Sequence, residues 1–501
     1  MRAASAAAVV LSLVLIAGGC TRRNEGYCCT TEEACSRAGG DGQITQCTDP
    51  ERPFCDNDGI YPASGGVGRT CIPLPGEACT GQTCDDPDMP VCYQGVCVGC
   101  GDSADCGPGA PVCGELDHVC GACSAAGDCA RFADRPYCDQ GACIGCRDAG
   151  DCSAGAPVCD PEDRVCRGCE DHGECATGVC DLGAGTCVAA GDILHVATDG
   201  VDRGECAAAA PCATIEYAAG RVAGSRMWIL VAPGSYAETV RLQGVRAHIV
   251  GPGAALTPDV AATPLLALLD SDVEVDGLAL RQAGGGDPAL GDGVRCGVDQ
   301  GTVPARLVLR RVEIAGNDGT GVESVSCELR IERSTIRDNG NGGLSAREAT
   351  FTVLNSFLVD NGAEGAPLGG ALLVGPAGSR FEHNTVAGNQ VADGVTAGVD
   401  CTGVLVLRNN IVFGNSPDNS DPQVSGNCSH EYSLIGPIGV AGDGNLLDDE
   451  PLFADAGEGD YHLQPGSPGI DAAAASDVAV DHDGEDRPAG SGPDMGADEV
   501  Q

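Results

Sequence analysis

The sequence contains no lysine. All 28 basic residues are arginines and face 73 acidic residues, so the formal net charge is −45. A chain this acidic is repelled by nucleic acids and anionic lipid surfaces, and we expect neither as a partner. Aromatic residues make up only 3% of the chain, and Trp228 is the only tryptophan. Because aromatic rings are the stacking surfaces of many sugar-binding clefts, their scarcity weighs against an extensive cleft of that kind.

Residues 305–415 contain a repeat. Its reference positions follow one another at steps of 22, 22, 28 and 26 residues and are Asn317, Asn339, Asn361, Asn389 and Asn415. Eight positions before them stand Leu309, Ile331, Val353, Phe381 and Leu407. Three positions before them stand Ile314, Ile336, Leu358, Val386 and Val412. Ten positions before them stand Leu307, Leu329, Phe351, Ser379 and Leu405. Apolar columns and a polar turn column that recur at this period indicate a solenoid.

The apolar residues within each unit alternate, as in Leu307 and Leu309, which is the spacing of a strand with one buried face. Stacked coils lie about 4.8 Å apart and bury these faces in one core. Asparagine suits the repeated turn because it tolerates left-handed φ/ψ and its amide can bond to the asparagines above and below. A leucine-rich repeat has an overlapping period, but its helical return does not fit a return this rich in glycine. We predict an all-β parallel β-helix.

The first twenty residues resemble a bacterial lipoprotein signal. Arg2 precedes an apolar run from Ala6 to Ala17, and Gly18-Gly19-Cys20 follows. The run is too short to favour a membrane span. The resemblance implies cleavage after residue 19, lipidation of Cys20 and passage to the outer membrane, since Thr21 stands where an aspartate would retain the protein. Ala17 stands where leucine is more common, so a plain signal peptide and secretion are the alternative.

Residues 28–187 contain a cysteine repeat. Cys100, Cys123, Cys146 and Cys169 are spaced 23 residues apart, and each is the second cysteine of a C-x-x-C pair. Such pairs suit zinc knuckles, but an exported chain meets an oxidising compartment, and small units without an apolar core are usually held by disulfides. The even number of 26 cysteines in this region agrees with disulfides. We therefore expect a signal peptide over 1–19, an irregular disulfide-rich stalk over 20–188 and the β-helix over 189–501.

Two further stretches carry a family resemblance. Val231–Val240 contains Pro-Gly-Ser-Tyr-Ala-Glu and resembles the opening coil of right-handed β-helix proteins of the pectin-lyase-like type. The closing stretches Asp481–Pro488 and Asp494–Glu499 resemble those of "choice-of-anchor Q" β-helix proteins, many of which are surface-attached, although Asp498 stands where they have tyrosine. The resemblance covers residues 192–500 and implies a right-handed β-helix at the cell surface, in a family of mixed functions.

The solenoid has six cysteines, which stacking allows us to pair. Cys296 and Cys327 are expected on the strand that follows the asparagine turn in neighbouring coils, and the same holds for Cys401 and Cys428. Three coil steps, about 14 Å, separate Cys327 from Cys401 and exclude that bond. The expected disulfides are Cys206–Cys212, Cys296–Cys327 and Cys401–Cys428.

Pectin-lyase-like proteins include polysaccharide lyases and hydrolases, whose catalytic groups would stand in the outward columns. The residues to test are Glu332, Arg333, Glu382 and His383, because a lyase needs clustered carboxylates for calcium and a base near the sugar. Alternating paired charges on a solvated face explain the same residues. The acidic cluster Asp481, Asp483, Glu485 and Asp486 lacks EF-hand spacing and is expected to be a solvated turn.

These observations favour a non-catalytic, lipid-anchored envelope protein whose β-helix binds a surface glycan or protein. No cofactor, metal or nucleic acid is expected, and the membrane is contacted only through the lipid. The alternative is a carbohydrate-active enzyme, a polysaccharide lyase or glycoside hydrolase, on the same β-helix. Three aligned carboxylates beside an arginine in one groove would favour the enzyme. Mutually paired charges and a groove filled by loops would favour the binding protein.

Overall fold

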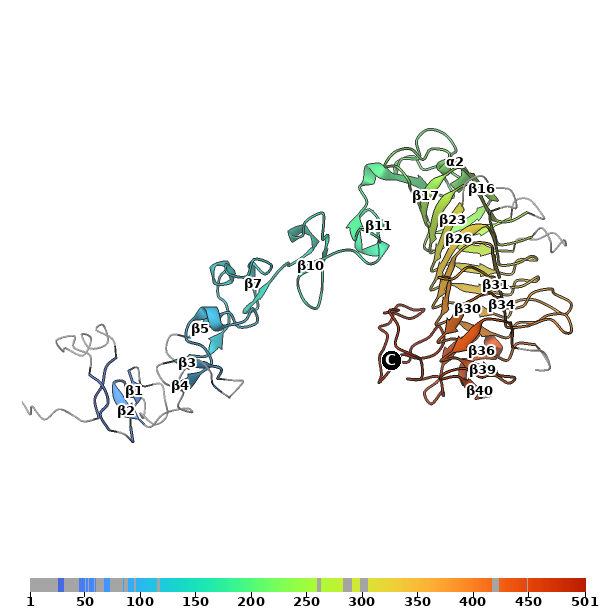
Figure 1. Ribbon diagram of the computed structural model, residues 1–501. Helices are drawn as coiled ribbons and strands as arrows, with labels where there is room; N and C mark the ends of the chain where they lie inside the picture. Colours follow the sequence, from blue (N-terminus) through green and yellow to red (C-terminus); the bar gives the residue numbers. More distant parts are fainter. Residues whose placement is uncertain are drawn as a thin grey trace, which may run out of the picture. The chain divides into compact units, whose positions relative to one another are not determined.

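The computed structural model describes residues 26–30, 45–49, 51–52, 54–57, 59, 67–72, 84, 89–93, 96–114, 118–258, 263–282, 291–297, 305–416, 423–447 and 449–501. The expected signal peptide and Cys20 lie outside these residues. No helix within the described ranges is long and apolar enough to cross a membrane. The chain forms two compact units, residues 1–169 with 184–186 and residues 170–183 with 187–501 (Figure 1). The second unit thus begins earlier than the boundary expected after residue 188.

The second unit is an all-β solenoid of three parallel sheets (Figure 1). Sheet 1 consists of β13 (Ile193–Val196), β14 (Trp228–Val231), β17 (Arg246–Val250), β20 (Asp272–Asp276), β23 (Ala305–Arg310), β26 (Cys327–Glu332), β29 (Phe351–Leu354), β32 (Arg380–Glu382), β35 (Val406–Arg408) and β38 (Ser429–Glu431). Sheet 2 consists of β15 (Gly234–Ala237), β18 (Ala254–Thr257), β21 (Ala279–Arg281), β24 (Glu313–Ala315), β27 (Thr335–Arg337), β30 (Phe357–Val359), β33 (Thr385–Ala387), β36 (Ile411–Phe413), β39 (Leu434–Gly436) and β40 (Leu446–Leu447). Sheet 3 consists of β16 (Val240–Gln243), β19 (Leu266–Leu269), β22 (Val294–Cys296), β25 (Val322–Val325), β28 (Leu344–Arg347), β31 (Ala371–Val374), β34 (Val399–Thr402) and β37 (Val424–Gly426). Each coil from β14 to β37 contributes one strand to each sheet, so the predicted parallel β-helix is confirmed.

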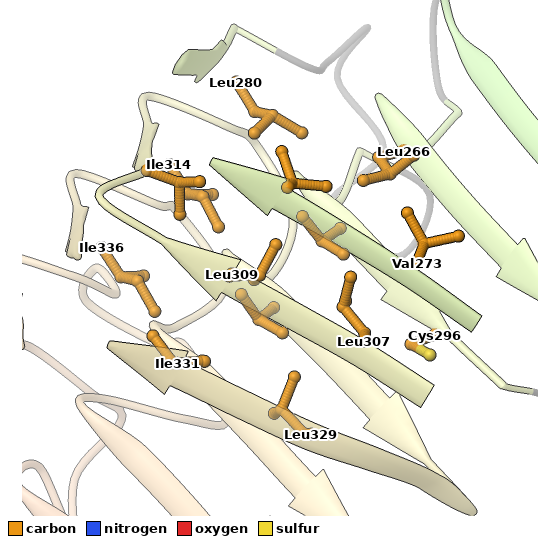
Figure 2. Close-up of a cluster of buried hydrophobic side chains, with 14 of the residues drawn as sticks. Leu266, Val273, Leu280, Cys296, Leu307, Leu309, Ile314, Leu329, Ile331 and Ile336 are labelled. Atoms are coloured by element: carbon orange, nitrogen blue, oxygen red, sulfur yellow. The ribbon is translucent and has the colours of Figure 1, made fainter. Parts of the chain in front are cut away.

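The apolar columns of the repeat form the core. Leu309 pairs with Ile331, and Ile331 with Val353, along sheet 1. Ile314 pairs with Ile336 along sheet 2 in the same register. All of these side chains are buried in one continuous cluster, in which like residues lie above like residues (Figure 2). The spacing of the sequence repeat therefore predicted both the register and the buried face.

The five asparagines form a buried ladder. The Nδ2 atom of each donates to Oδ1 of the next, from Asn317 to Asn339 at 2.8 Å and from Asn389 to Asn415 at 2.8 Å. Their backbone is not left-handed, however, and that part of the prediction is wrong. The left-handed residue stands one position earlier in each coil, as Gly316, Asp338, Asp360, Gly388 and Gly414. The bend is therefore made by the preceding residue, and the asparagine side chain turns inward to bond along the stack.

A second buried polar ladder lies at the turn between sheets 1 and 2, and four of its five members stand five positions before an asparagine of the first ladder. Hydroxyl or amide oxygens accept a hydrogen bond from the backbone N–H one coil earlier at Ser334, Ser356, Asn384, Asn410 and Ser433. Each of these side chains is fully or almost fully buried. This ladder is not evident from the sequence because its residue type varies. Its constant offset from the asparagines could have revealed it.

The opening of the β-helix is built around Glu238, the glutamate of the resemblance motif. A short helix, α2 (Ile215–Ala219), is capped by the Thr214 hydroxyl, which accepts from Tyr217 N. Glu238 comes from a later part of the chain and accepts from the backbone nitrogen of Ile215 at 2.9 Å. Burial outweighs these helix N–H groups and raises the pKa of Glu238 to about 7. The motif thus joins the first helix to the first coil.

The cysteine-rich region is an array of short hairpins and 3-10 turns. Its elements are β1 (Phe54–Asp56), β2 (Thr70–Ile72), β3 (Val91–Tyr93), β4 (Val96–Val98), η2 (Ser103–Asp105), β5 (Val112–Cys113), β6 (Cys120–Gly121), η3 (Ala126–Cys129), β7 (Tyr137–Asp139), β8 (Ala142–Ile144), η4 (Ala149–Asp151), β9 (Val158–Cys159), β10 (Cys166–Arg167), η5 (His172–Glu174), β11 (Cys180–Asp181), β12 (Thr186–Cys187) and η6 (Ala190–Asp192). Every cysteine among the described residues is disulfide-bonded, as expected, rather than free for zinc. The two cysteines of a C-x-x-C pair belong to different bonds, since Cys120 closes one module with Cys106 and Cys123 opens the next with Cys138.

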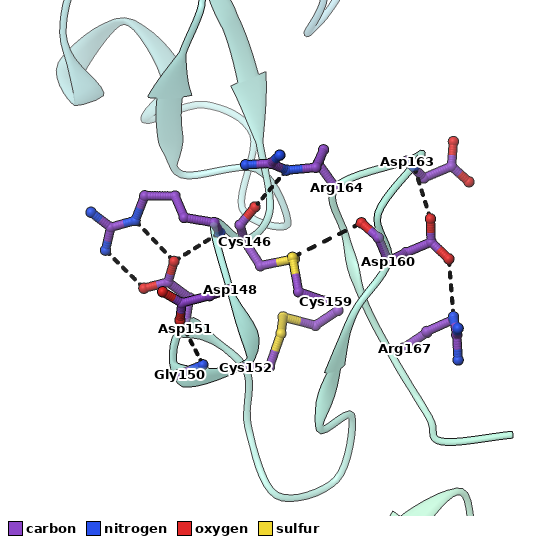
Figure 3. Close-up of a disulfide and its surroundings, with 12 residues drawn as sticks. Cys146, Asp148, Gly150, Asp151, Cys152, Cys159, Asp160, Asp163, Arg164 and Arg167 are labelled. Atoms are coloured by element: carbon purple, nitrogen blue, oxygen red, sulfur yellow. Dashed lines mark hydrogen bonds and ion pairs between the residues drawn. A yellow bond between two sulfur atoms is a disulfide. The ribbon is translucent and has the colours of Figure 1, made fainter. Parts of the chain in front are cut away.

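The Gly-Asp-Cys motif of each module caps its 3-10 turn. Asp128 Oδ2 accepts from the backbone nitrogens of Ser124 at 2.8 Å and Ala125 at 3.1 Å. These two bonds lower the pKa of Asp128. Asp151 accepts in the same way from Arg147 N at 2.8 Å, and Asp148 accepts from Gly150 N (Figure 3). The recurring acid thus supplies an acceptor for otherwise unpaired N–H groups.

The three expected disulfides of the solenoid are present: Cys206–Cys212, Cys296–Cys327 and Cys401–Cys428. The expected placement needs a correction. Cys296 and Cys401 lie on sheet 3, but Cys327 begins β26 of sheet 1 and Cys428 directly precedes β38. The residue paired with Cys296 in the ladder is Ser324, so the bond crosses the corner between two sheets. Because coil length varies, the distance from the asparagine did not identify the strand.

Candidate functional site

The outer face of sheet 1 carries a network of charges. Alternate residues of its strands point away from the core, and the parallel register places them beside one another. Arg310 Nε lies 3.0 Å from Glu332 of the next coil, and Arg310 Nη1 lies 3.0 Å from Glu274 of the preceding coil. Hydrogen bonds from His248 and Arg306, together with the charge of Arg310, hold the pKa of Glu274 far below its usual range. Paired charges of this kind occupy most of the face.

The closing segment of the chain, residues 471–500, lies along the same face. Asn355 Nδ2 donates to the carbonyl of Val480 at 2.6 Å, and Arg333 Nε donates to the carbonyl of His482 at 3.0 Å. Arg380 lies 2.7 Å from Asp477. A hairpin, β41 (Phe453–Asp455) with β42 (Asp460–Leu463), precedes this segment, and Tyr461 donates to Asp360 at 2.6 Å. The closing segment therefore covers part of the outward columns.

A groove of about 290 Å³ remains open on this face. Glu170 and Leu182 line it on one side, and residues Asp477 to Val480 line it on another. Its floor comes from sheet 1 and the turn that follows it, with the charged residues Asp276, Arg310, Arg311, Arg330, Glu332, Arg333 and Arg380. All of these residues belong to the second unit.

The four residues selected from the sequence are not brought together as one site. Glu332 and Arg333 line the groove, whereas Glu382 is paired with Arg380 at 2.5 Å. His383 is fully buried beneath the closing segment, with Nδ1 3.1 Å from Asp494 O and Nε2 2.9 Å from Asn409 Nδ2. Burial and the nearby Arg487 charge lower the pKa of His383 well below its usual value. His383 is thus a buried structural residue, and the four residues to test do not form one catalytic group.

The acidic cluster near the C-terminus also differs from the solvated turn that was expected. Asp481 is fully buried, and its carboxylate accepts from the backbone nitrogens of Gly484 at 2.8 Å, Glu485 at 2.8 Å and Glu499 at 3.1 Å. Asp483, Glu485 and Asp486 are exposed, as expected. Because protein N–H groups already bond both oxygens of Asp481, it organises a turn instead of offering a ligand to calcium.

A buried ion pair holds the closing motif. Arg487 and Glu499 lie 3.2 Å apart, and neither side chain is exposed. Arg487 also donates to the carbonyls of Asp494 at 2.6 Å and Asp498 at 3.1 Å. Its guanidinium thus joins the two stretches that resembled the closing region of known β-helix proteins. The sequence contained both partners, but nothing in their spacing paired them.

A second groove of about 430 Å³ adjoins the first, with Leu182, Asp276 and Arg310 lining both. It contains the only tryptophan, Trp228, whose ring is stacked on His248 with centroids 4.1 Å apart. This pair is not evident from the sequence because its members come from successive coils of sheet 1. Together the two grooves place one aromatic pair and several guanidinium groups on the same face.

One family of known proteins matches part of the β-helix. The family described as "Right handed beta helix region" matches residues 291–434, and a family of unknown function matches residues 99–193. The crystal structure of pectate lyase Pel9A is similar over 62% of this chain and 96% of that chain, with 14% identity and a TM-score of 0.36. A search of curated proteins gives no match. The chain is a right-handed parallel β-helix protein with a disulfide-rich N-terminal region.

Proposed function

We propose that this protein is a non-catalytic component of the cell envelope whose β-helix binds a surface glycan in the grooves of sheet 1. The observation that carries the proposal is the pairing of charges on that face. A lyase needs carboxylates free to hold calcium and a base that reaches the sugar. Here Glu274 and Glu332 are neutralised by arginines, and His383 is buried.

The proposal includes attachment to the membrane through Cys20, with the cysteine-rich region as a stalk between anchor and β-helix. It is supported by Ala17-Gly18-Gly19-Cys20 and by the resemblance of the closing motif to surface-attached "choice-of-anchor Q" proteins. Labelling cells that express the full chain with an alkyne fatty acid tests the anchor. The wild type should be labelled and recovered with the outer membrane, whereas Cys20→Ser should not be labelled. An unlabelled, secreted wild type would contradict this part of the proposal.

A carbohydrate-active enzyme is the second candidate, because the groove over sheet 1 contains Glu332 beside several arginines. Incubation with a panel of polysaccharides, with and without calcium, separates the two candidates. For a binding protein we expect retention of a polymer and no product. Release of unsaturated products, seen as ultraviolet absorbance, would establish a lyase, and new reducing ends without that absorbance would establish a hydrolase. Retention of an envelope protein in place of any polymer would shift the partner from a glycan to a protein.

A further inference from the structure

The groove bounded by Glu170, Glu332 and Val480 reverses the charge balance of the chain. The whole sequence has 28 arginines and 73 acidic residues. Among the residues that line this groove are five arginines and four carboxylates, namely Arg310, Arg311, Arg330, Arg333, Arg380, Glu170, Asp276, Glu332 and Asp477. A cluster of guanidinium groups in a strongly acidic protein makes this groove the place where an anionic ligand meets least repulsion.

Four of the five arginines have carboxylate partners within the protein. Arg310 is held by Glu274 and Glu332. Arg311 is paired with Asp276 and Asp171, and Arg330 with Glu332. Arg380 is paired with Glu382 and Asp477. Arg333 differs, because it forms no ion pair with any residue that the structure describes.

The surroundings of Arg333 fix the position of its guanidinium without neutralising it. Nε donates to the carbonyl of His482 at 3.0 Å, while Nη1 and Nη2 have no hydrogen-bond partner among the described residues. The guanidinium packs against Gly484, where any side chain would overlap it. Burial and the neighbouring charge of Arg311 lower the pKa of Arg333, and the more distant charges of Asp481, Asp276 and Asp483 only partly oppose this shift. A cation held beside another cation is stabilised by an anion that contacts it.

We propose that Arg333 is the anchor of an anion-binding subsite, which takes a sulfate or carboxylate group of an acidic glycan. The planar guanidinium has two free donor nitrogens, which match the two oxygens of either group in a bidentate pair. Binding through arginine needs no bridging metal ion. The inference rests on the proposed function, since it names the class of glycan that this groove selects.

The test compares Arg333→Gln with Arg347→Gln in the full-length protein. Arg347 is a matched control because it lies on sheet 3 and is paired with Glu323. Binding to dextran sulfate, polygalacturonate and unmodified dextran is measured by affinity electrophoresis in EDTA at constant ionic strength. Circular dichroism of each variant checks that the fold is retained.

We expect the wild type to bind one or both acidic polymers and not dextran, and Arg333→Gln to weaken that binding about tenfold. Arg347→Gln should change it less than about twofold. Preference for dextran sulfate would identify a sulfated ligand, and preference for polygalacturonate a uronate. Equal binding of dextran would overturn the anionic subsite while leaving a glycan-binding role intact. Equal loss in both variants would also overturn it, and binding of no polymer would remove the proposed function as well.

Discussion

The cysteine-rich modules and the β-helix are stabilised by different means. In a module, each disulfide joins two cysteines that are 13 to 15 residues apart in the sequence, as in Cys100–Cys113 and Cys123–Cys138. The buried apolar cluster there is little more than three cysteines packed against Phe132 and Cys138. In the β-helix, each coil uses the coil before it as a template, and one apolar core extends along the stack. The modules depend on oxidation, whereas the β-helix depends on neighbouring coils.

Reduction of the disulfides should therefore unfold the modules and leave the β-helix folded, and this is the largest effect we expect. With a phosphine reductant, the modules over residues 100–168 should unfold, because loops of this size gain about 3 kcal/mol from each bond and little from apolar burial. The coils over residues 305–416 should stay folded. Hydrogen exchange measured peptide by peptide checks both halves of the statement, and modules that remain protected after reduction would contradict it.

The second prediction concerns the ion pair that closes the β-helix unit. Arg487→Met should destabilise the closing segment by about 3–5 kcal/mol, because it leaves the Glu499 carboxylate buried without its partner. Arg408→Met is the control, since Arg408 pairs with Glu431 at an exposed position and should cost less than about 1 kcal/mol. Urea unfolding followed by hydrogen exchange of residues 471–500 measures the difference. Similar losses in both variants would mean that the buried pair has no special role.

The third prediction tests whether the polar ladder stabilises the stack in the way that disulfides stabilise the modules. Asn361→Ala removes bonds to Asn389 and to the carbonyl of Ile336, and it leaves buried groups unpaired. We expect a loss of about 2–3 kcal/mol in thermal or urea unfolding. Asn341→Ala is the matched control: Asn341 is half-buried, and its side chain has no hydrogen bond among the described residues. If the control loses as much free energy of unfolding as Asn361→Ala, the ladder has no special stabilising role.

The contrast between the regions also explains what could be predicted from the sequence. The apolar columns of the core could be predicted because Leu309 and Ile331 stand at the same offset from an asparagine in successive units. The same regularity produced the correct disulfide pairs but not the corner positions of Cys327 and Cys428, since coil lengths differ. A repeat of 22 to 28 residues does not predict that the closing segment, more than a hundred residues later in the chain, packs against sheet 1.

The same limit explains why the residues of the candidate site could not be identified from the sequence. His383 looked like an outward catalytic base, yet Asp494 and Arg487 bury it, and both follow it by more than a hundred residues. Trp228 looked isolated until the register of sheet 1 placed His248 against it. Arg333 looked like one charge among many, and only the absence of an ion pair in the described part of the chain distinguishes it. These properties depend on tertiary contacts that no local pattern encodes.

The smallest effect we predict distinguishes the hairpin and closing segment from the stacked coils by their response to pH. His462 lies between Asp460, at 2.6 Å, and Asp483, at 2.9 Å. Burial opposes its charge, but the hydrogen bond to Asp460 and the charges of Asp498 and Asp483 raise the pKa of His462. A histidine whose pKa is higher in the folded state stabilises the fold below about pH 6.5, and this contribution is lost as the pH rises through the folded-state pKa. His462→Gln should therefore cost about 0.5 kcal/mol at pH 5.5 and close to nothing at pH 9, since the side chain is partly exposed and the pairs are screened. Thermal unfolding of both proteins at the two pH values measures this, and a cost that does not change with pH would show that His462 acts by packing against Phe357 instead.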